Sequence, residues 1–341
     1  METTSFIAPL TLHYDTLEYH SGISYRKNMQ GNYLVETWLP KLIVILGPTA
    51  SGKSALAVWL AKRFGGEIIS ADSRQIYRGL DIGTGKIAKR EMRGILHHLL
   101  SFQNPKRGFS ADQFRKLAER KIRDIRKRAH LPFLVGGTGF YIDAVARGIK
   151  YPKVAPNQKL RKALGGKPTK ELYRILRALD PARAKTIDRN NPRRLIRAIE
   201  IAEATKEPLP KLAEEKTYDA LFIGIRRPRP ELRRRIRAAI RKRVQRGLLR
   251  ETRNLIQREI PEKRLAELGL DYGIAADYLK HRISREAMLA KLESATWRYA
   301  KRQETWFRKH RDIHWISNET EAKKLVKDFL SKESSEQQPK P

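Results

Sequence analysis

The chain reads Leu42-Ile43-Val44-Ile45-Leu46 and continues directly as Gly47-Pro48-Thr49-Ala50-Ser51-Gly52-Lys53-Ser54. The apolar run has the length and residue types of a buried strand, and a helical stretch follows from Ala55 to Phe64. Glycines let the turn between them fold tightly, so that its N–H groups can point inward at phosphate oxygens. A strand, a glycine-rich turn and a helix in this order predict a phosphate-binding P-loop in an α/β domain.

This motif predicts a site for a diphosphate or a triphosphate. The helix after the turn adds its positive N-terminal end, and Lys53 adds a mobile positive charge. The hydroxyl of Ser54 is suited to be a Mg²⁺ ligand, so Mg²⁺ is the expected cofactor. The expected diphosphate- or nucleotide-binding residues are Gly47, Pro48, Thr49, Ala50, Ser51, Gly52, Lys53 and Ser54.

Composition narrows the class of protein. The 341 residues include 72 Lys and Arg but only 37 Asp and Glu, a net charge of +35 that favours a polyanionic partner such as nucleic acid. The absence of cysteine excludes disulfides and thiolate metal sites. No apolar run reaches the ~20 residues of a membrane span, and no secretory signal is expected, so we predict a cytoplasmic enzyme without a membrane partner.

The pattern along the chain predicts a parallel α/β sheet with crossover helices and two helical additions. Residues 1–40 show no clear periodicity and are interpreted as an N-terminal extension. The predicted P-loop core spans 41–140, an inserted all-helical subdomain 141–217, the return to the core with basic C-terminal helices 218–317, and a terminal segment with a disordered tail 318–341. The predicted strands are Leu42–Leu46, Glu67–Ser70, Phe133–Val135 and Leu221–Ile225.

Two further segments follow predicted strands, at the edge where α/β sites are built. The first, Asp72-Ser73-Arg74-Gln75-Ile76-Tyr77, offers a carboxylate that could ligate Mg²⁺, accept a proton or simply cap a helix. The second, Gly136-Gly137-Thr138-Gly139, would bring backbone close to a ligand and present a hydroxyl, or would only form a tight turn. We interpret His97-His98 as a packing, phosphate or RNA contact rather than a metal site.

Basic and aromatic residues alternate near the C-terminus. Arg298, Lys301 and Arg302 accompany Trp297, Tyr299, Trp306 and Phe307, a mixture that suits contact with an RNA backbone and stacking on bases. An amphipathic helix with buried aromatics is the alternative, which we favour for Trp306 and Phe307.

In combination these motifs resemble one family, the tRNA dimethylallyltransferases, also called tRNA isopentenyltransferases, in their bacterial form. The resemblance runs from about Lys41 to Ser317 and rests on motifs that stand in the family's order. They are Gly47–Ser54, Asp72–Tyr77 with Asp81-Ile82-Gly83-Thr84, His97-His98-Leu99, Gly136-Gly137-Thr138, Pro192-Arg193-Arg194-Leu195, and Ala300-Lys301-Arg302-Gln303 with Thr305-Trp306.

The resemblance implies transfer of a dimethylallyl group from dimethylallyl diphosphate to N6 of the adenine 3′ of the tRNA anticodon. Its P-loop would hold the diphosphate of the prenyl donor rather than ATP as a phosphoryl donor. Asp72 would accept the N6 proton, Thr138 would lie by the reacting centre, and Arg235 would help to neutralise the diphosphate. The implied partner is the anticodon stem-loop, bound by a monomer through Asp72, Ser73, Arg74, Gln75, Thr138, Arg193, Arg194 and Arg197.

The chain departs from the family pattern at four positions that concern tRNA contact. Ser101 replaces an Asp, Ala239 an Arg, Gly273 a basic residue and Trp297 an Arg. Three other functions remain open from the residues: a small-molecule P-loop kinase, an isopentenyltransferase acting on free adenine nucleotides, and a non-catalytic RNA-binding NTPase. None of the three needs the P-loop, Asp72, the helical insertion and the +35 charge together.

Overall fold

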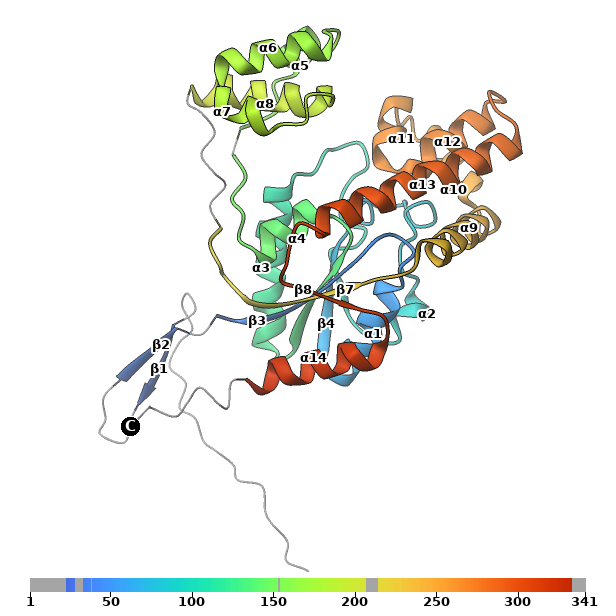
Figure 1. The fold of residues 1–341 in the computed structure, drawn as a ribbon. Helices are drawn as coiled ribbons and strands as arrows, with labels where there is room; N and C mark the ends of the chain where they lie inside the picture. Colours follow the sequence, from blue (N-terminus) through green and yellow to red (C-terminus); the bar gives the residue numbers. More distant parts are fainter. Residues whose placement is uncertain (1–22, 28–32, 38, 153, 207–213, 333–341) are drawn as a thin grey trace, which may run out of the picture.

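The structure is a computed structural model that describes residues 23–27, 33–37, 39–152, 154–206 and 214–332. Within these residues six parallel strands form one sheet in the order β5-β4-β6-β3-β7-β8 (Figure 1). The strands are β3 Lys41–Leu46, β4 Gly66–Ala71, β5 His97–His98, β6 Leu131–Gly136, β7 Asp219–Ile225 and β8 Ile313–Ile316. This architecture confirms the predicted α/β class and the four predicted strands.

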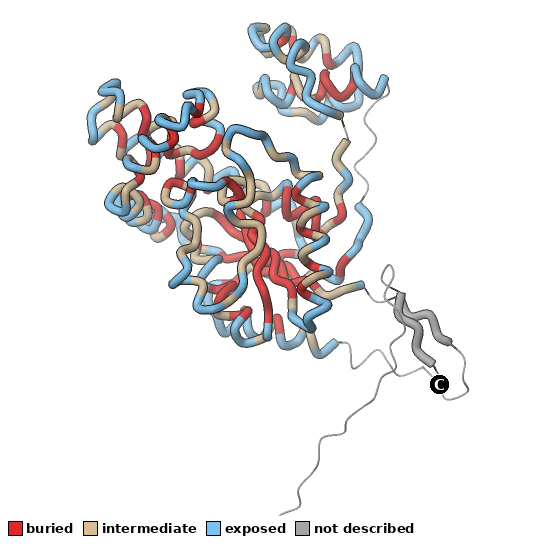
Figure 2. The backbone as a smooth tube through the Cα atoms, turned by 180° about the vertical axis from the view of Figure 1, so that it is seen from behind, coloured by how far each residue is buried: buried red, intermediate tan, exposed pale blue. Residues whose placement is uncertain are grey.

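Helices cover both faces of the sheet, which explains why its strands read as unbroken apolar runs. On one face Leu42, Val44 and Leu46 pack with α3 (Ala111–Lys127) and α4 (Gly139–Ala146). On the other, Ile43 and Ile45 pack with α1 (Lys53–Arg63) and α14 (Glu319–Ser331). The buried strands at the centre of Figure 2 are therefore anchored on both sides, and their carboxyl ends are held in fixed positions.

The insertion is a small helical unit with its own core. It consists of α5 Gln158–Leu164, α6 Thr169–Leu179, α7 Pro181–Thr186 and α8 Pro192–Thr205, set apart from the sheet in Figure 1. Leu172, Leu176, Leu195 and Ile199 lie at its centre. The predicted boundary at 141 falls inside α4, whose residues pack on the sheet, so the inserted helices begin only at Gln158.

The basic C-terminal helices form a third packed unit. They are α9 Arg229–Gln245, α10 Leu248–Gln257, α11 Glu262–Leu268, α12 Leu270–Leu279 and α13 Arg285–Phe307. Their core also contains Ile76, Tyr77 and Leu80, which come from the segment that follows β4. The helical unit thus holds the Asp72–Tyr77 segment against the carboxyl edge of the sheet.

Five short elements depart from the prediction, and one of them is β8, where no strand was predicted. β1 (Ile23–Lys27) and β2 (Tyr33–Thr37) form an antiparallel pair in the part of the chain where no element was predicted. Both are rich in β-branched and aromatic residues, but only five residues long, too short to show a period. β5 and the helix α2 (Lys89–Met92) are shorter still. Residues 1–22 and most of the predicted disordered tail (333–341) lie outside the described residues.

In the parts of the chain that the structure describes, each helix is too short or too polar to cross a bilayer.

The buried carboxylate of Glu200, on α8, links α8 to α5 within the insertion. It accepts two hydrogen bonds from Arg161 (2.9 and 2.8 Å), one from Arg197, and one from the backbone N–H of Asn157 (2.5 Å). Burial by itself raises the pKa of Glu200, but the arginine hydrogen bonds outweigh it and bring the pKa to about 2. Because this pKa lies below its ordinary value of 4.5, the stabilisation is complete above pH 4.5 and is lost as pH falls toward 2.

We therefore expect Glu200→Gln to lower the opening free energy of α8 by about 1–3 kcal/mol at pH 7, because two half-buried guanidinium groups lose their charged hydrogen-bond partner. Hydrogen-exchange protection of the α8 amides, corrected for intrinsic rates, measures this change. Wild-type protection should decline toward that of the variant between pH 4.5 and pH 2. Glu203→Gln, an exposed position on the same helix, is the control; an equal effect there would contradict the assignment.

Candidate active site

The phosphate loop, residues 47–54, joins β3 to α1 as predicted. Gly47 (φ 151°) and Gly52 (φ 100°) take left-handed backbone conformations that favour glycine. A Cβ on Gly47 would also press on Ser51 Oγ at 3.0 Å. Gly52 is the residue before α1, so the loop delivers the chain straight into the helix N-terminus. The geometry is that of a loop built to surround an anion.

Lys53 supplies the positive charge that faces the phosphate loop. Its ammonium donates to the backbone oxygen of Pro48 (3.4 Å), and it lines the same pocket as the carboxylate of Asp72. Burial lowers the pKa of Lys53, and the negative charge of Asp72 only partly opposes that shift. The ammonium of a half-buried lysine that has no hydrogen-bonded carboxylate is stabilised when a phosphate binds beside it. The lysine is therefore suited to hold a phosphate group.

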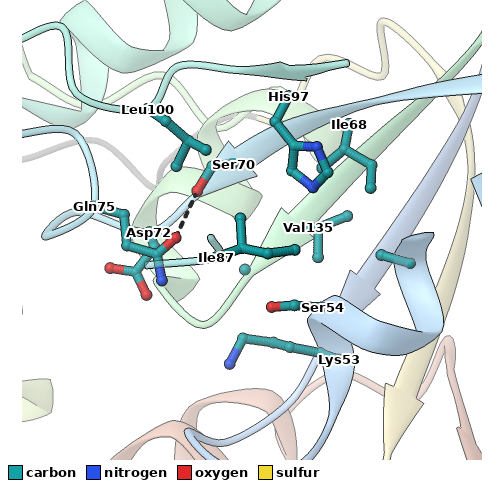
Figure 3. A pocket seen from close by; sticks show the side chains of 12 residues that line it. Lys53, Ser54, Ile68, Ser70, Asp72, Gln75, Ile87, His97, Leu100 and Val135 are labelled. Atoms are coloured by element: carbon teal, nitrogen blue, oxygen red, sulfur yellow. Dashed lines mark hydrogen bonds between the residues drawn. The ribbon is translucent and has the colours of Figure 1, made fainter. Parts of the chain in front are cut away.

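The second wall of the site comes from the end of β4. Asp72 Oδ1 accepts a hydrogen bond from the backbone N–H of Arg74 (2.9 Å), which fixes the carboxylate. Ser70 Oγ donates to Oε1 of Gln75 (3.4 Å), and this bond is drawn in Figure 3. The figure also shows the ammonium of Lys53 and the hydroxyl of Ser54 turned toward the Asp72 side of the pocket.

The glycine-rich turn after β6 forms the third wall. Thr138 Oγ1 accepts a hydrogen bond from the backbone N–H of Ser73 (3.0 Å), and the N–H of Thr138 donates to Ala71 O (3.2 Å). Gly136 must lack a side chain, because a Cβ there would overlap the backbone of Ala71. Thr138 and the Asp72–Gln75 segment, predicted separately from two motifs, are thus brought together.

One face of α13 closes the site. The side-chain amide of Gln303 accepts from the backbone N–H of Thr49 (2.8 Å) and donates to Gly137 O (2.9 Å), so it joins the phosphate loop to the turn after β6. One turn earlier, Tyr299 lies beside Thr138 and Asp72; burial, together with the charge of Asp72, raises its pKa to about 12. Gln303 belongs to a motif quoted in the sequence analysis, but neither role was predicted.

Residues of α1, β4, β6 and the segments that follow β4 and β5 line a pocket with two kinds of side chain. Ala57, Ile68, Ile87, Leu100 and Val135 supply apolar side chains. The polar lining consists of Lys53, Ser54, Ser70, Asp72, Gln75 and His97. His97 is held by a hydrogen bond between Nδ1 and Ile95 O (2.8 Å), and burial lowers its pKa. The pocket can therefore accept a small molecule with a charged end and an apolar end.

His98 does not belong to the lining of this pocket. Its Nε2 lies 2.6 Å from the buried carboxylate of Glu67, which also binds Arg128 and His130 (Nδ1, 2.6 Å). His97 thus lines the pocket, whereas His98 makes a packing contact, which is one of the interpretations given in the sequence analysis.

The loop of residues 81–86 is positioned by a residue that the sequence did not single out. The carboxylate of Glu251 accepts from the backbone N–H groups of Asp81 (2.8 Å), Ile82 (2.9 Å) and Gly83 (2.9 Å), and from the hydroxyl of Tyr272 (2.7 Å). The same loop carries Lys86, which bonds Asp81 and Ser101 (both 2.6 Å).

The predicted arginines occupy different environments. Arg74 donates to Glu267 O (2.8 Å) and so ties the Asp72 segment to α11. Arg235 is exposed and bonds Glu231 (2.9 Å), whereas the unpredicted Arg227 hydrogen-bonds the phosphate loop at Ser51 O (3.2 Å). The sequence signal that could have identified Arg227 is its position just after β7, the strand that pairs with β3.

The three arginines predicted on the insertion do not behave alike. Arg193 and Arg194 are exposed near the start of α8, away from the pocket (Figure 1). Arg197 is half-buried, pairs with Glu200 and donates to Val154 O (2.8 Å). Its charge is therefore already used within the insertion.

Known proteins are similar to this chain over most of its length. The family model for IPP transferase matches residues 75–310. A tRNA dimethylallyltransferase of Alkaliphilus oremlandii is 39% identical over 303 residues, covering 85% of this chain and 97% of that protein. A tRNA dimethylallyltransferase 1 of Geotalea uraniireducens is 41% identical over 297 residues, covering 85% and 96%. The crystal structure of a tRNA isopentenylpyrophosphate transferase from Bacillus halodurans, 36% identical, superposes with a TM-score of 0.65 over 86% of this chain and 98% of that one.

We expect Gln303→Met to weaken binding of inorganic diphosphate about five- to tenfold, because the phosphate loop loses its link to the turn after β6. The melting temperature should also fall, since Gly137 O is left without its buried donor. Isothermal titration and scanning calorimetry measure the two effects. Lys301→Met, an exposed change on the same helix, is the control. Unchanged diphosphate affinity in the Gln303 variant would show that the link does not support the loop.

Proposed function

The chain belongs to the IPP transferase family, and on this premise we propose that it transfers a dimethylallyl group from dimethylallyl diphosphate to tRNA. The proposed acceptor is N6 of the adenine immediately 3′ of the anticodon, and diphosphate is released. The proposed enzyme acts as a monomer in the cytoplasm. tRNA is its substrate, and the reaction makes it a prenyltransferase.

The choice of a prenyl diphosphate as the donor rests on the pocket, whose lining is partly charged and partly apolar. Lys53 and the loop amides offer positive charge to a diphosphate, whereas Ile68, Leu100 and Val135 offer apolar contacts within the same pocket. A prenyl diphosphate matches both halves, with its reactive carbon at the boundary between them.

The proposed reaction needs a proton acceptor and a stabilised leaving group. A bond forms between N6 and the first prenyl carbon, the bond from that carbon to the diphosphate oxygen breaks, and the N6 proton passes to Asp72. The carboxylate is suited to this role because one oxygen is held by Arg74 N–H (2.9 Å) at the edge of the pocket. Thr138 lies close to Asp72, because its Oγ1 accepts a hydrogen bond from the backbone N–H of Ser73. Tyr299 lies beside both Thr138 and Asp72.

Charge on the departing diphosphate is met from the phosphate loop and Lys53. We assign a supporting part to Arg235, which is linked to the loop through neighbouring ion pairs. Arg235 bonds Glu231 (2.9 Å), Glu231 lies 3.8 Å from Arg227, and Arg227 donates to the loop at Ser51 O. An arginine in this row of ion pairs can help to neutralise the negative charge that develops on the leaving diphosphate.

The residues present also fit a Mg²⁺ ion. Ser54 is exposed at the start of α1, and its hydroxyl turns toward the pocket that Asp72 lines (Figure 3). One hydroxyl, completed by diphosphate oxygens and waters, is an oxygen-only set of the kind that Mg²⁺ takes. The bound ion would neutralise diphosphate charge. Ser54 would be its protein ligand.

The assay for this proposal is incubation of the protein with undermodified tRNA and dimethylallyl diphosphate, followed by mass analysis of the nucleosides. Prenylated adenosine and free diphosphate are the expected products. ATP turnover without tRNA would instead support a kinase or NTPase, and prenylation of free adenine nucleotides alone would support the smaller class of isopentenyltransferases.

In the same assay we expect Asp72→Ala to lose about 10²- to 10⁴-fold in turnover, the usual contribution of a general base. Its tRNA affinity should remain near that of the wild type, because the basic surface is unchanged. Asp124→Asn, on the exposed side of α3, is the matched control. Turnover within about threefold of the wild type would rule out Asp72 as the base.

The exposed pair Arg193 and Arg194 is proposed to contact phosphates of the anticodon stem. Replacing both with Ala should reduce the slope of log affinity against log salt by roughly 1.5 to 2 units. Turnover at saturating tRNA should change much less, because neither residue lines the pocket. Lys323→Ala with Lys327→Ala on α14 removes the same charge far from the insertion. An identical salt slope in both double variants would refute the proposed contact.

A further inference from the structure

Three aromatic side chains meet at the surface beside Thr138. Phe140 is 49% exposed, and an exposed group of large apolar side chains is typical of a binding surface. Its ring centroid lies 4.4 Å from that of Trp306 and 5.5 Å from that of Tyr151. We call Phe140, Tyr151 and Trp306 the aromatic cluster. No step of the proposed reaction uses it.

The rings of the cluster are held in place from below. Trp306 Nε1 donates to the buried carboxylate of Asp143 (2.8 Å), which fixes the plane of the indole. Gly139 makes room for it, because a Cβ at that position would overlap the indole ring. Phe140 is therefore exposed above a support whose orientation is fixed before any ligand binds.

The cluster continues the wall of the site. Tyr299, Gln303 and Trp306 succeed one another at helical spacing on one face of α13. The first lies beside Asp72 and Thr138, and the second binds the phosphate loop. Phe140 itself follows Thr138 in the first turn of α4. A ligand that extends out of the site past Thr138 meets the aromatic cluster.

We propose that the aromatic cluster stacks one unpaired nucleobase of the substrate RNA, next to the adenine that enters the site. This inference rests on the proposed function. An adenine that leaves its stack to reach Asp72 exposes the faces of its neighbours, and an aromatic ring covers such a face. Exposed Arg302 lies one turn before Trp306, where it can meet the adjoining phosphate. The chain's charge of +35 favours RNA over a protein partner.

The test uses the full chain and a synthetic anticodon stem-loop RNA that contains the target adenine. Phe140→Ala should weaken the Kd for this RNA about 5- to 100-fold, the usual effect of removing one base–aromatic stack. Phe140→Tyr, which keeps the ring, should restore the affinity. Binding of inorganic diphosphate should be unchanged in both variants. Leu39→Ala, an equally exposed apolar position before β3, is the control.

Abasic RNAs then identify the stacked base. At one position beside the adenine, removing the base should weaken wild-type binding and leave Phe140→Ala with no further loss, since both changes delete the same contact. Additive losses at every position, or wild-type affinity in Phe140→Ala, would overturn the stacking. If the wild type binds the RNA with this pattern but does not prenylate it, the proposed function fails and the stacking stands. If it prenylates the RNA without the pattern, only the stacking fails.

Discussion

The side-chain amide of Gln303 is the contact on which the geometry of the site depends. Strands β3 and β6 lie side by side, but the loops that leave them share no ladder hydrogen bonds. Gln303 bonds one loop at Thr49 and the other at Gly137, and it is itself buried. Because it sits on α13, the same contact sets where Tyr299 and Trp306 stand relative to both loops. One amide thus links the phosphate loop, the turn after β6 and this face of α13.

Much of this architecture could be predicted from the sequence where the signal is local. The phosphate loop and the four long strands each follow from neighbouring residues, and the structure confirms them. Four polar residues of the pocket lining, Lys53, Ser54, Asp72 and Gln75, could be predicted as well, because they follow strands whose carboxyl ends meet at one edge. The apolar lining was not predicted.

What could not be predicted depends on partners far apart in the chain. Glu251 binds the amides of residues 81–83, and Arg227 reaches Ser51; nothing within a helical or strand period marks either pair. Arg197 was grouped with Arg193 and Arg194 because all three lie on the inserted helical subdomain. Its partner Glu200 is only three residues away, but the sequence does not show that this carboxylate is buried and shared with Arg161. Residues of the same type therefore have different roles, depending on whether the fold leaves them exposed or partly buries them.

The position of the insertion has a consequence for how the protein is made. β3 pairs with β6 on one edge and with β7 on the other, and all the inserted helices lie between β6 and β7 in the chain. During synthesis β3 therefore keeps one edge open until the whole insertion has left the ribosome. The separate core of the insertion allows it to fold as a unit meanwhile. Early closure of the insertion shortens the time for which an apolar strand edge is available to other nascent chains.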